Sequence, residues 1–136
     1  MTDAAHDRFA ILEVGHSFDF TIDGGDFDAH TALFTEDFTF ESDYGDHDSV
    51  ESYREWVEGF HSQMKEKGGT RHVMSNPVVM LDGDEAEVEA YLVIYSQGDG
   101  SVLGTAVTRD RMRRVDGTWK IAKRVLRVDA NARPDG

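Results

Sequence analysis

Apolar positions recur at helical spacing through the first half of the chain. Between Asp7 and Ile22 their pattern predicts a helix that is buried on more than one side, with Asp7 or Thr2 as its N-cap. Asp23 and the two glycines after it end this helix, and Asp26 can cap a second, short one. A third helical pattern runs from residue 50 to residue 64, after an alternating strand at residues 38–42. The first half is therefore predicted to hold three helices and one strand.

After Gly69 the pattern changes to alternating strands separated by turns. Glycine turns stand at residues 82–83, 98–100 and 116–117. Counting outward from loops of two, three and two residues sets three glutamates opposite three arginines: Glu85 and Arg113, Glu87 and Arg111, Glu89 and Arg109. Opposite charges across a ladder favour this register. The same count places His72 beside Val93 and Arg124 beside Arg109, although a single β-bulge would invert the face downstream of it.

Helices followed by a meander of strands predict an α+β fold, with the helices gathered on one side of a strongly curved antiparallel sheet. The count puts these residues on the face of His72: Met74, Asn76, Tyr91, Tyr95, Val107, Arg124 and Leu126. The other face is also apolar, with Ala86, Val88, Ala90, Leu92, Ile94, Val102 and Ala106. Because three helices can cover only one face, we expect the second face to form a subunit interface in a homodimer or homotrimer.

Length and charge narrow the class of protein. A chain of 136 residues has the size of one domain, which we expect to span residues 1–136. Its 27 acidic and 14 basic residues give a net charge of −13, which repels nucleic-acid phosphates and anionic lipid headgroups. The chain has no cysteine, no leader-like N-terminus and no apolar run long enough to span a bilayer. We therefore expect a cytoplasmic protein with neither nucleic-acid nor membrane partners.

Three segments together resemble SnoaL-like domains of the nuclear transport factor two-like superfamily. They are residues 22–37, residues 70–76 with the sequence Thr-Arg-His-Val-Met-Ser-Asn, and residues 109–121, which end in Thr118-Trp119-Lys120-Ile121. The resemblance spans roughly residues 7–129 and leaves a short, flexible C-terminal tail. It implies a cone, or cystatin-like α+β roll, in which a curved antiparallel sheet and three helices enclose a pocket.

The resemblance also implies a candidate site. In scytalone dehydratase, bile acid 7α-dehydratase and hexachlorocyclohexane dehydrochlorinase, an aspartate after the first helix pairs with a histidine on the strand after the third. Asp23 and His72 match those two places, and Arg124 looks like the arginine that the dehydrochlorinase brings into its pocket. Phe18 stands where those enzymes can carry a lysine or tyrosine, so this chain is unlike the dehydrochlorinase in that respect.

The chemistry of these residues suits proton transfer. An imidazole is a serviceable base at neutral pH, and a carboxylate beside it fixes its tautomer and stabilises the imidazolium. We therefore expect His72 to take a proton from carbon with Asp23 behind it, while Arg124 or a tyrosine stabilises a departing oxygen or an enolate. The candidate tyrosines and further pocket residues are Tyr44, Tyr91, Tyr95, Phe18 and Asn76, which could instead shape a bend before Pro77.

Each candidate also has a purely structural interpretation. His72 could be a hydrogen-bonded core histidine, Asp23 a turn residue, and Arg124 the partner of an acid across the sheet. Asp19 is interpreted as a charge on a helix face. The remaining histidines show no metal-ligand spacing, and we interpret them as surface or helix-face residues: His6, His16, His30, His47 and His61.

Two functions remain open from the sequence. The first is a cofactor-independent lyase or isomerase that acts on a small, mostly apolar molecule held in the cone, without a metal. The second is a non-catalytic binding or accessory module, such as the small subunit of ring-hydroxylating oxygenases, whose Arg-His-x-x-x-Asn pattern residues 71–76 resemble. An open pocket with His72 bonded to Asp23 would favour the enzyme. A pocket filled by Phe18, Phe20 and Phe40 would favour the module.

Overall fold

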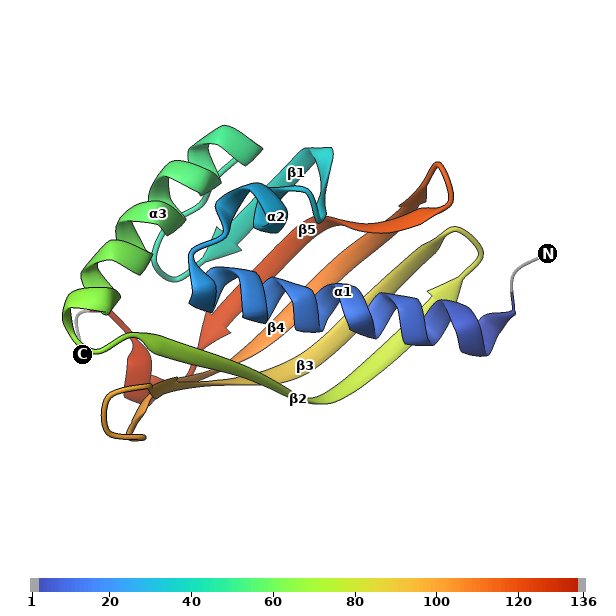
Figure 1. The fold of residues 1–136 in the computed structure, drawn as a ribbon. Coiled ribbons are helices and arrows are strands. Elements are labelled where there is room, and N and C mark those ends of the chain that lie inside the picture. The colour runs from blue at the N-terminus through green and yellow to red at the C-terminus, as the bar shows by residue number, and fades with distance from the viewer. Residues whose placement is uncertain (1–2, 135–136) are drawn as a thin grey trace.

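A computed structural model describes residues 3–134 and shows three α-helices packed against one five-stranded sheet (Figure 1). This arrangement confirms the predicted α+β class. The elements in chain order are α1 Ala4–Gly24, α2 Phe27–Thr31, β1 Phe34–Ser42, α3 Val50–Glu66, β2 Thr70–Asp82, β3 Glu85–Ser96, β4 Val102–Val115, β5 Thr118–Val128 and a short 3₁₀ helix at Ala130–Ala132.

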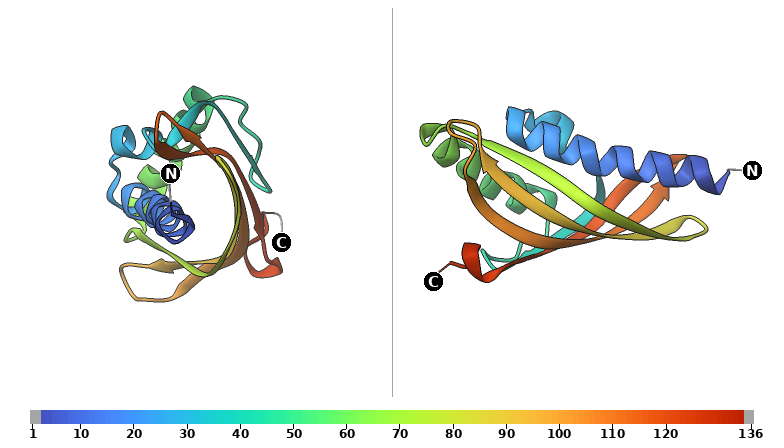
Figure 2. Two further views of the ribbon diagram at one scale, coloured as in Figure 1. Left: turned by 90° about the vertical axis from the view of Figure 1, so that its right-hand side faces the viewer. Right: turned by 90° about the horizontal axis from the view of Figure 1, so that it is seen from below.

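The sheet is strongly curved and holds the long helix α1 in its concave side (Figure 2). Its strand order is β1-β5-β4-β3-β2. The strands β2 to β5 form the expected antiparallel meander, but β1 pairs with β5 in parallel, so the sheet is mixed at one edge. Because β1 and β5 are distant in sequence, no hairpin turn sets their direction, and the chain connects them through α3 and the strands β2 to β4.

The helix ends follow from capping side chains. Asp3, Asp26 and Ser49 each accept a hydrogen bond from a backbone N–H in the first turn of the helix that follows. The N-cap of α1 is therefore Asp3, one turn before the predicted Asp7, while Thr2 lies outside the described residues. Asp7 is instead buried, with its carboxylate 2.7 Å from the Arg114 guanidinium.

The apolar face of α1 is narrower than the sequence predicts. Phe9 and Phe20 have 64% and 81% of their surface exposed, so the helix is buried on one side only. Ile11, Phe18 and Ile22 form the buried side and pack in the main core. The sequence shows apolar residues on both sides of this helix and does not indicate which side is buried. The buried side is the one that packs against the sheet.

The register of β3 with β4 is as predicted, but a bulge on β2 and another on β5 change the faces of these two strands. Glu85, Glu87 and Glu89 lie opposite the three expected arginines. The predicted loop Asp82-Gly83 is wrong by one residue, because Asp82 pairs with Glu85 and the turn is at residues 83–84. The ladder of β2 then shifts at Asn76-Pro77, where proline has no N–H to donate and Asn76 has a φ of 55°. The two changes together place His72 beside Ile94 and not Val93. On β5 a shift at Ala122 places Arg124 beside Asp110 and not Arg109.

Because of these bulges, His72 and Arg124 lie on the face of the sheet that was predicted to be the outer one. The set that was expected on the outer face includes Ala86, Val88, Ala90, Leu92 and Ala106, and these residues are buried on the concave side. The predicted subunit interface was thus based on the wrong residues. The convex side carries other exposed apolar side chains: Val73, Val78, Met80 and Tyr91. Association through this sheet face stays a prediction.

The end of the described chain packs on the sheet. Asn131 donates a hydrogen bond to the Thr105 hydroxyl, and the Tyr44 hydroxyl donates to the carbonyl of Ala132 at 2.6 Å. The flexibility of the tail after residue 129 stays a prediction. Within residues 3–134, no helix combines the length and the apolar character that crossing a membrane requires.

Candidate active site

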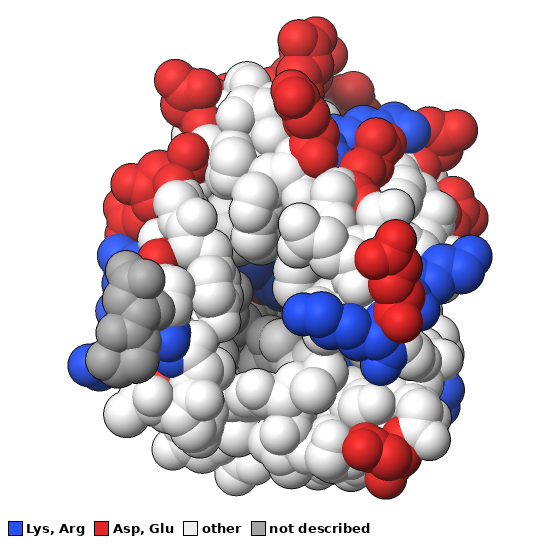
Figure 3. Space-filling view, turned by 90° about the vertical axis from the view of Figure 1, so that its left-hand side faces the viewer, with Lys and Arg blue, Asp and Glu red and all other residues white. Residues whose placement is uncertain are grey.

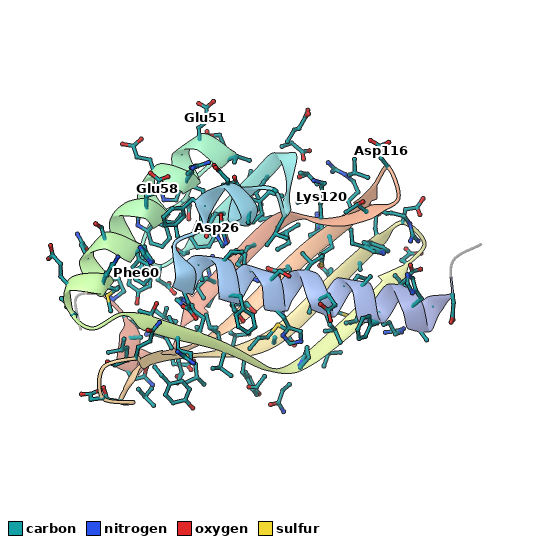
Figure 4. All side chains as sticks on the ribbon, in the orientation of Figure 1. Asp26, Glu51, Glu58, Phe60, Asp116 and Lys120 are labelled. Carbon is teal, nitrogen blue, oxygen red and sulfur yellow. The ribbon has the colours of Figure 1, made fainter. Side chains whose placement is uncertain are left out.

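A cavity of about 830 Å³ lies between α3, the last turns of α1 and the concave side of the sheet. The space-filling view shows a hollow in this end of the molecule, with largely uncharged atoms around it (Figure 3). Its walls are mainly apolar and come from Phe18, Phe40, Trp56, Phe60, Leu92 and Leu126. Phe60 projects from α3 on the side of the sheet (Figure 4), and its ring centroid is 6.3 Å from that of His72.

Asp23 and His72 form the predicted pair at one wall of this cavity. The His72 Nδ1 lies 2.6 Å from the Asp23 carboxylate, which also accepts hydrogen bonds from the His72 backbone N–H at 2.8 Å and from the Thr70 hydroxyl at 3.1 Å. Since a carboxylate can only accept, Nδ1 carries the imidazole hydrogen and Nε2 carries the lone pair. His72 is 8% exposed and lines the cavity, so its basic nitrogen is available there.

Arg124 also reaches the cavity, from β5. Its guanidinium donates two 2.7 Å hydrogen bonds to Asp110 and lies over the Phe18 ring, with Cζ 3.6 Å from the ring centroid. Burial is the largest single effect and lowers the pKa of Arg124, but the charge and hydrogen bonds of Asp110, with the charges of Asp19 and Tyr53, together raise it above its usual value, so the side chain keeps its charge. Every side-chain nitrogen in residues 3–134 that is fully buried has a hydrogen-bond partner. The remaining Arg124 nitrogen, Nη1, makes no hydrogen bond within these residues, so it is not fully buried and contacts accessible space.

Of the other residues predicted to form the pocket, two line the cavity and three do not. Phe18 lines the cavity, and Tyr44 lies at its rim with its hydroxyl bonded to the chain end. Asn76, Tyr91 and Tyr95 were predicted on the face of His72, but the bulge at Asn76-Pro77 inverts that face. Asn76 is exposed within the bulge, while Tyr91 and Tyr95 alternate with the inward residues of β3 and do not line the cavity.

His30 and Tyr53 are interior residues of the site that the sequence did not reveal. His30 was predicted at the surface, but it is fully buried, and Tyr53 is 1% exposed in the cavity wall. The His30 Nε2 lies 2.9 Å from the Tyr53 hydroxyl, and Nδ1 lies 2.8 Å from the Thr21 hydroxyl. Since Thr21 gives its own hydrogen to backbone carbonyls, it accepts from Nδ1, and Tyr53 donates to Nε2. The helical spacing of apolar residues places Tyr53 on a buried side of its helix, and a buried tyrosine hydroxyl needs a hydrogen-bond partner. That need was the feature of the sequence that could have indicated a buried polar residue beside Tyr53.

Asp19 and His47 also lie differently from their predicted places. Asp19 is 7% exposed, and burial raises the pKa of its carboxyl against the opposing effects of the Arg124 and His72 charges. His47, predicted at the surface, lines the cavity with its Nδ1 2.7 Å from the Ser52 hydroxyl. No three His, Asp or Glu side chains in residues 3–134 lie together as a metal-binding group.

Burial of His30 predicts a specific loss of stability in acid. Burial, with smaller effects from the Arg124 and His72 charges, lowers the pKa of His30 to about 3, whereas the unfolded chain protonates near pH 6.5. Between these values the unfolded state binds more protons, so stability falls as the pH falls, by about 1.4 kcal/mol per pH unit. In urea unfolding at pH 7 and pH 5, the wild type should lose about 2 kcal/mol more than His30→Gln. The exposed His6→Gln should behave as the wild type, and an equal loss in His30→Gln would contradict this assignment.

The comparisons with known proteins agree with this geometry. A curved sheet that holds helices around an open cavity defines the cystatin-like, nuclear transport factor two-like class of α+β folds. Within that class the chain belongs to the SnoaL-like domain family, whose model matches residues 3–125. No curated protein matches the chain.

Solved structures share the fold over nearly the whole chain. A protein of unknown function with a cystatin-like fold from Nostoc punctiforme is 26% identical, with a TM-score of 0.84 and 96% of each chain covered. A nuclear transport factor two-like protein from Novosphingobium aromaticivorans is 21% identical, with a TM-score of 0.82 over 95% of this chain and 88% of that one. A protein provisionally named scytalone dehydratase from the same organism is 22% identical, with a TM-score of 0.77 over 92% and 85%.

Proposed function

We propose that the protein is a cofactor-independent lyase or isomerase in which His72 removes a proton from carbon. The proposal rests on one observation: an imidazole whose Nδ1 is bonded to Asp23 lines an open, mostly apolar cavity of about 830 Å³. The substrate is a small, mostly apolar molecule, because the walls offer aromatic and aliphatic surface and only a few polar groups.

The residues divide the reaction between them. The lone pair of the His72 Nε2 takes the proton from carbon, and Asp23 stabilises the imidazolium that results. The electrons of the broken C–H bond move toward an oxygen of the substrate, which becomes an enolate or departs in an elimination. Arg124, which stays charged and contacts accessible space through Nη1, stabilises the negative charge on that oxygen. In an isomerisation His72 returns its proton to another carbon.

The cavity favours this proposal over the accessory module. The module required a pocket filled by three phenylalanines, but Phe20 points away from the cavity with 81% of its surface exposed. Phe18 and Phe40 form walls and leave the space between them open. The shared fold of a protein provisionally named scytalone dehydratase is in line with a dehydratase reaction.

Proton abstraction can be tested before the natural substrate is known. Cyclic ketones such as 2-tetralone and cyclohexanone fit a cavity of this kind, and His72 should exchange their α-protons for deuterium in deuterium oxide. We expect the wild type to accelerate this exchange, measured by proton NMR, and His72→Gln to lose about 10²-fold or more. Tyr91→Phe, on the convex face, should exchange as the wild type does. Equal rates for the wild type and His72→Gln would contradict the proposal.

A further inference from the structure

His47 is a residue of the cavity wall to which the proposed reaction gives no role. It lies shortly after β1, where its backbone N–H donates to the Phe40 carbonyl and its carbonyl accepts from the Phe40 N–H, each at 2.8 Å. The side chain is half-buried and lines the cavity together with Ser52 of α3. The loop after β1 is therefore fixed to the strand in a way that keeps an imidazole in the cavity wall.

The imidazole ring of His47 lies among aromatic side chains that also line the cavity. Its centroid is 5.6 Å from that of Trp56, 6.3 Å from that of Phe40 and 6.5 Å from that of Tyr53. The Nδ1 atom lies 2.7 Å from the Ser52 hydroxyl, which limits rotation of the ring. The side chain is thus oriented before any ligand binds, and a ligand would not lose affinity by ordering it.

The second nitrogen of His47, Nε2, makes no hydrogen bond within residues 3–134. Every fully buried side-chain nitrogen in this part of the chain has a partner, so Nε2 is not fully buried and contacts accessible space. If Ser52 donates to Nδ1, then Nε2 carries the hydrogen and donates. If Nδ1 donates to Ser52, then Nε2 accepts. A hydroxyl group on a ligand suits both cases, because it can donate and accept.

Two other polar residues of the cavity wall stand close to His47 and Ser52 in sequence, Tyr44 and Glu55. The Tyr44 hydroxyl gives its hydrogen to the Ala132 carbonyl at 2.6 Å. Glu55 is exposed, so water competes for its carboxylate. His47, held by Ser52, is therefore the polar group best placed to bind a ligand at this end of the cavity.

A row of aromatic rings connects His47 with the catalytic dyad. The ring next to His47 is that of Trp56, whose centroid is 5.8 Å from that of Phe60, and the Phe60 centroid is 6.3 Å from that of His72. From Ser52 to Phe60, α3 rises about 12 Å at about 1.5 Å per residue. The two histidines thus stand at the two ends of one apolar wall.

We propose that His47, oriented by Ser52, is a specificity-determining residue that binds a hydroxyl group at the end of the substrate remote from the reacting carbon. This inference rests on the proposed function of His72, and it narrows the substrate class to cyclic molecules with an oxygen group at each end. One oxygen lies beside His72 and Arg124, where negative charge develops. The other is a hydroxyl that forms a hydrogen bond with the His47 Nε2, while the apolar rings between them contact Trp56 and Phe60.

The first test compares the binding of two ketones that differ only in the remote hydroxyl group, 6-hydroxy-2-tetralone and 2-tetralone. The wild type should bind the hydroxylated ketone about 3- to 10-fold more tightly in NMR titrations, because a hydrogen bond to a neutral group contributes about that factor. His47→Phe keeps a flat ring and removes both nitrogens, so it should bind the two ketones equally. Ser52→Ala releases the imidazole and should reduce the preference.

The matched control for the binding test is His6→Phe, which makes the same change at an exposed position on α1. It should keep the wild-type preference for the hydroxylated ketone. A wild type that binds the two ketones equally or binds neither, or a His47→Phe variant that keeps the preference, would overturn the proposal.

The second test measures deuterium exchange into the same two ketones. In the wild type the hydroxylated ketone should reach half-saturation at an about 3- to 10-fold lower concentration, and His47→Phe should abolish this difference. If His72→Gln loses exchange while His47→Phe discriminates as the wild type does, only the role of His47 is wrong. If His72→Gln keeps exchange, the proposed function is wrong, and the binding preference, which needs no catalysis, decides the role of His47.

Discussion

Asp23→Asn is expected to lower the rate of His72-dependent deuterium exchange by about 10²- to 10⁴-fold. The Asp23 carboxylate accepts from the imidazole Nδ1 at 2.6 Å and holds the ring with Nε2 free to act as the base. An amide has no negative charge to stabilise the imidazolium, and its NH₂ group can face Nδ1 and reverse the tautomer. Both effects act on the chemical step, so the loss should appear in the maximal rate more than in the ketone concentration at half-saturation.

The measurement follows exchange by proton NMR across a pH series and records the His72 tautomer by long-range nitrogen correlation in the same samples. Asp26→Asn is the matched control, because Asn caps the start of α2 as well as Asp does (Figure 4). It should retain the wild-type rate. An Asp23→Asn variant that exchanges within twofold of the wild type would show that the pair has only a structural role.

The Asp23–His72 pair could be predicted because both residues stand at element boundaries. Asp23 precedes the two glycines that end α1, and Gly25 takes the left-handed conformation there with φ of 70°. His72 stands at the start of β2, directly after the turn formed by Gly68 and Gly69. The contact itself needed the family resemblance, because 49 residues separate the two side chains and no local pattern connects them.

The faces of the strands could not be predicted because single-residue bulges decide them. Alternation assigns residues to a face only relative to their neighbours, and each bulge exchanges the faces beyond it. Both faces of β3 read as apolar, since Tyr91 and Leu92 are equally acceptable in a core. The charge pairs fixed the register of β3 with β4, but nothing similar marked Ala122, and Arg124 was therefore placed beside the wrong residue.

The burial of two titratable side chains was missed for a different reason. Histidine and aspartate on a helix are usually exposed unless they are paired, so His30 and Asp19 were predicted at the surface. Their burial depends on the curvature of the sheet, which brings Arg124 on β5 close to α1. Such long-range proximity of a cation to helix residues leaves no periodic signal in the sequence.

Removal of the Asp110 charge is expected to produce the largest loss of stability. Arg124 and Asp110 are each 4% exposed and share two 2.7 Å hydrogen bonds. In Asp110→Ala, the guanidinium stays buried without its counter-charge, which costs about 3–5 kcal/mol for pairs of this kind. The exposed pair of Arg109 and Glu89 provides a contrast on the opposite face of the sheet, because Glu89→Ala should cost only about 0–1 kcal/mol. Urea unfolding measures both losses, and similar values for the two variants would contradict the expectation.

A double-mutant cycle then separates stability from function. Arg124→Met fills similar volume without a charge, so adding it to Asp110→Ala should recover much of the lost stability, since no unpaired cation remains. Deuterium exchange should stay low in the double variant, because the group that stabilises the substrate oxygen is gone. A stable double variant that exchanges at the wild-type rate would remove Arg124 from the mechanism. A stable but inactive one would show that this chain keeps a costly buried ion pair because the cavity needs its cation.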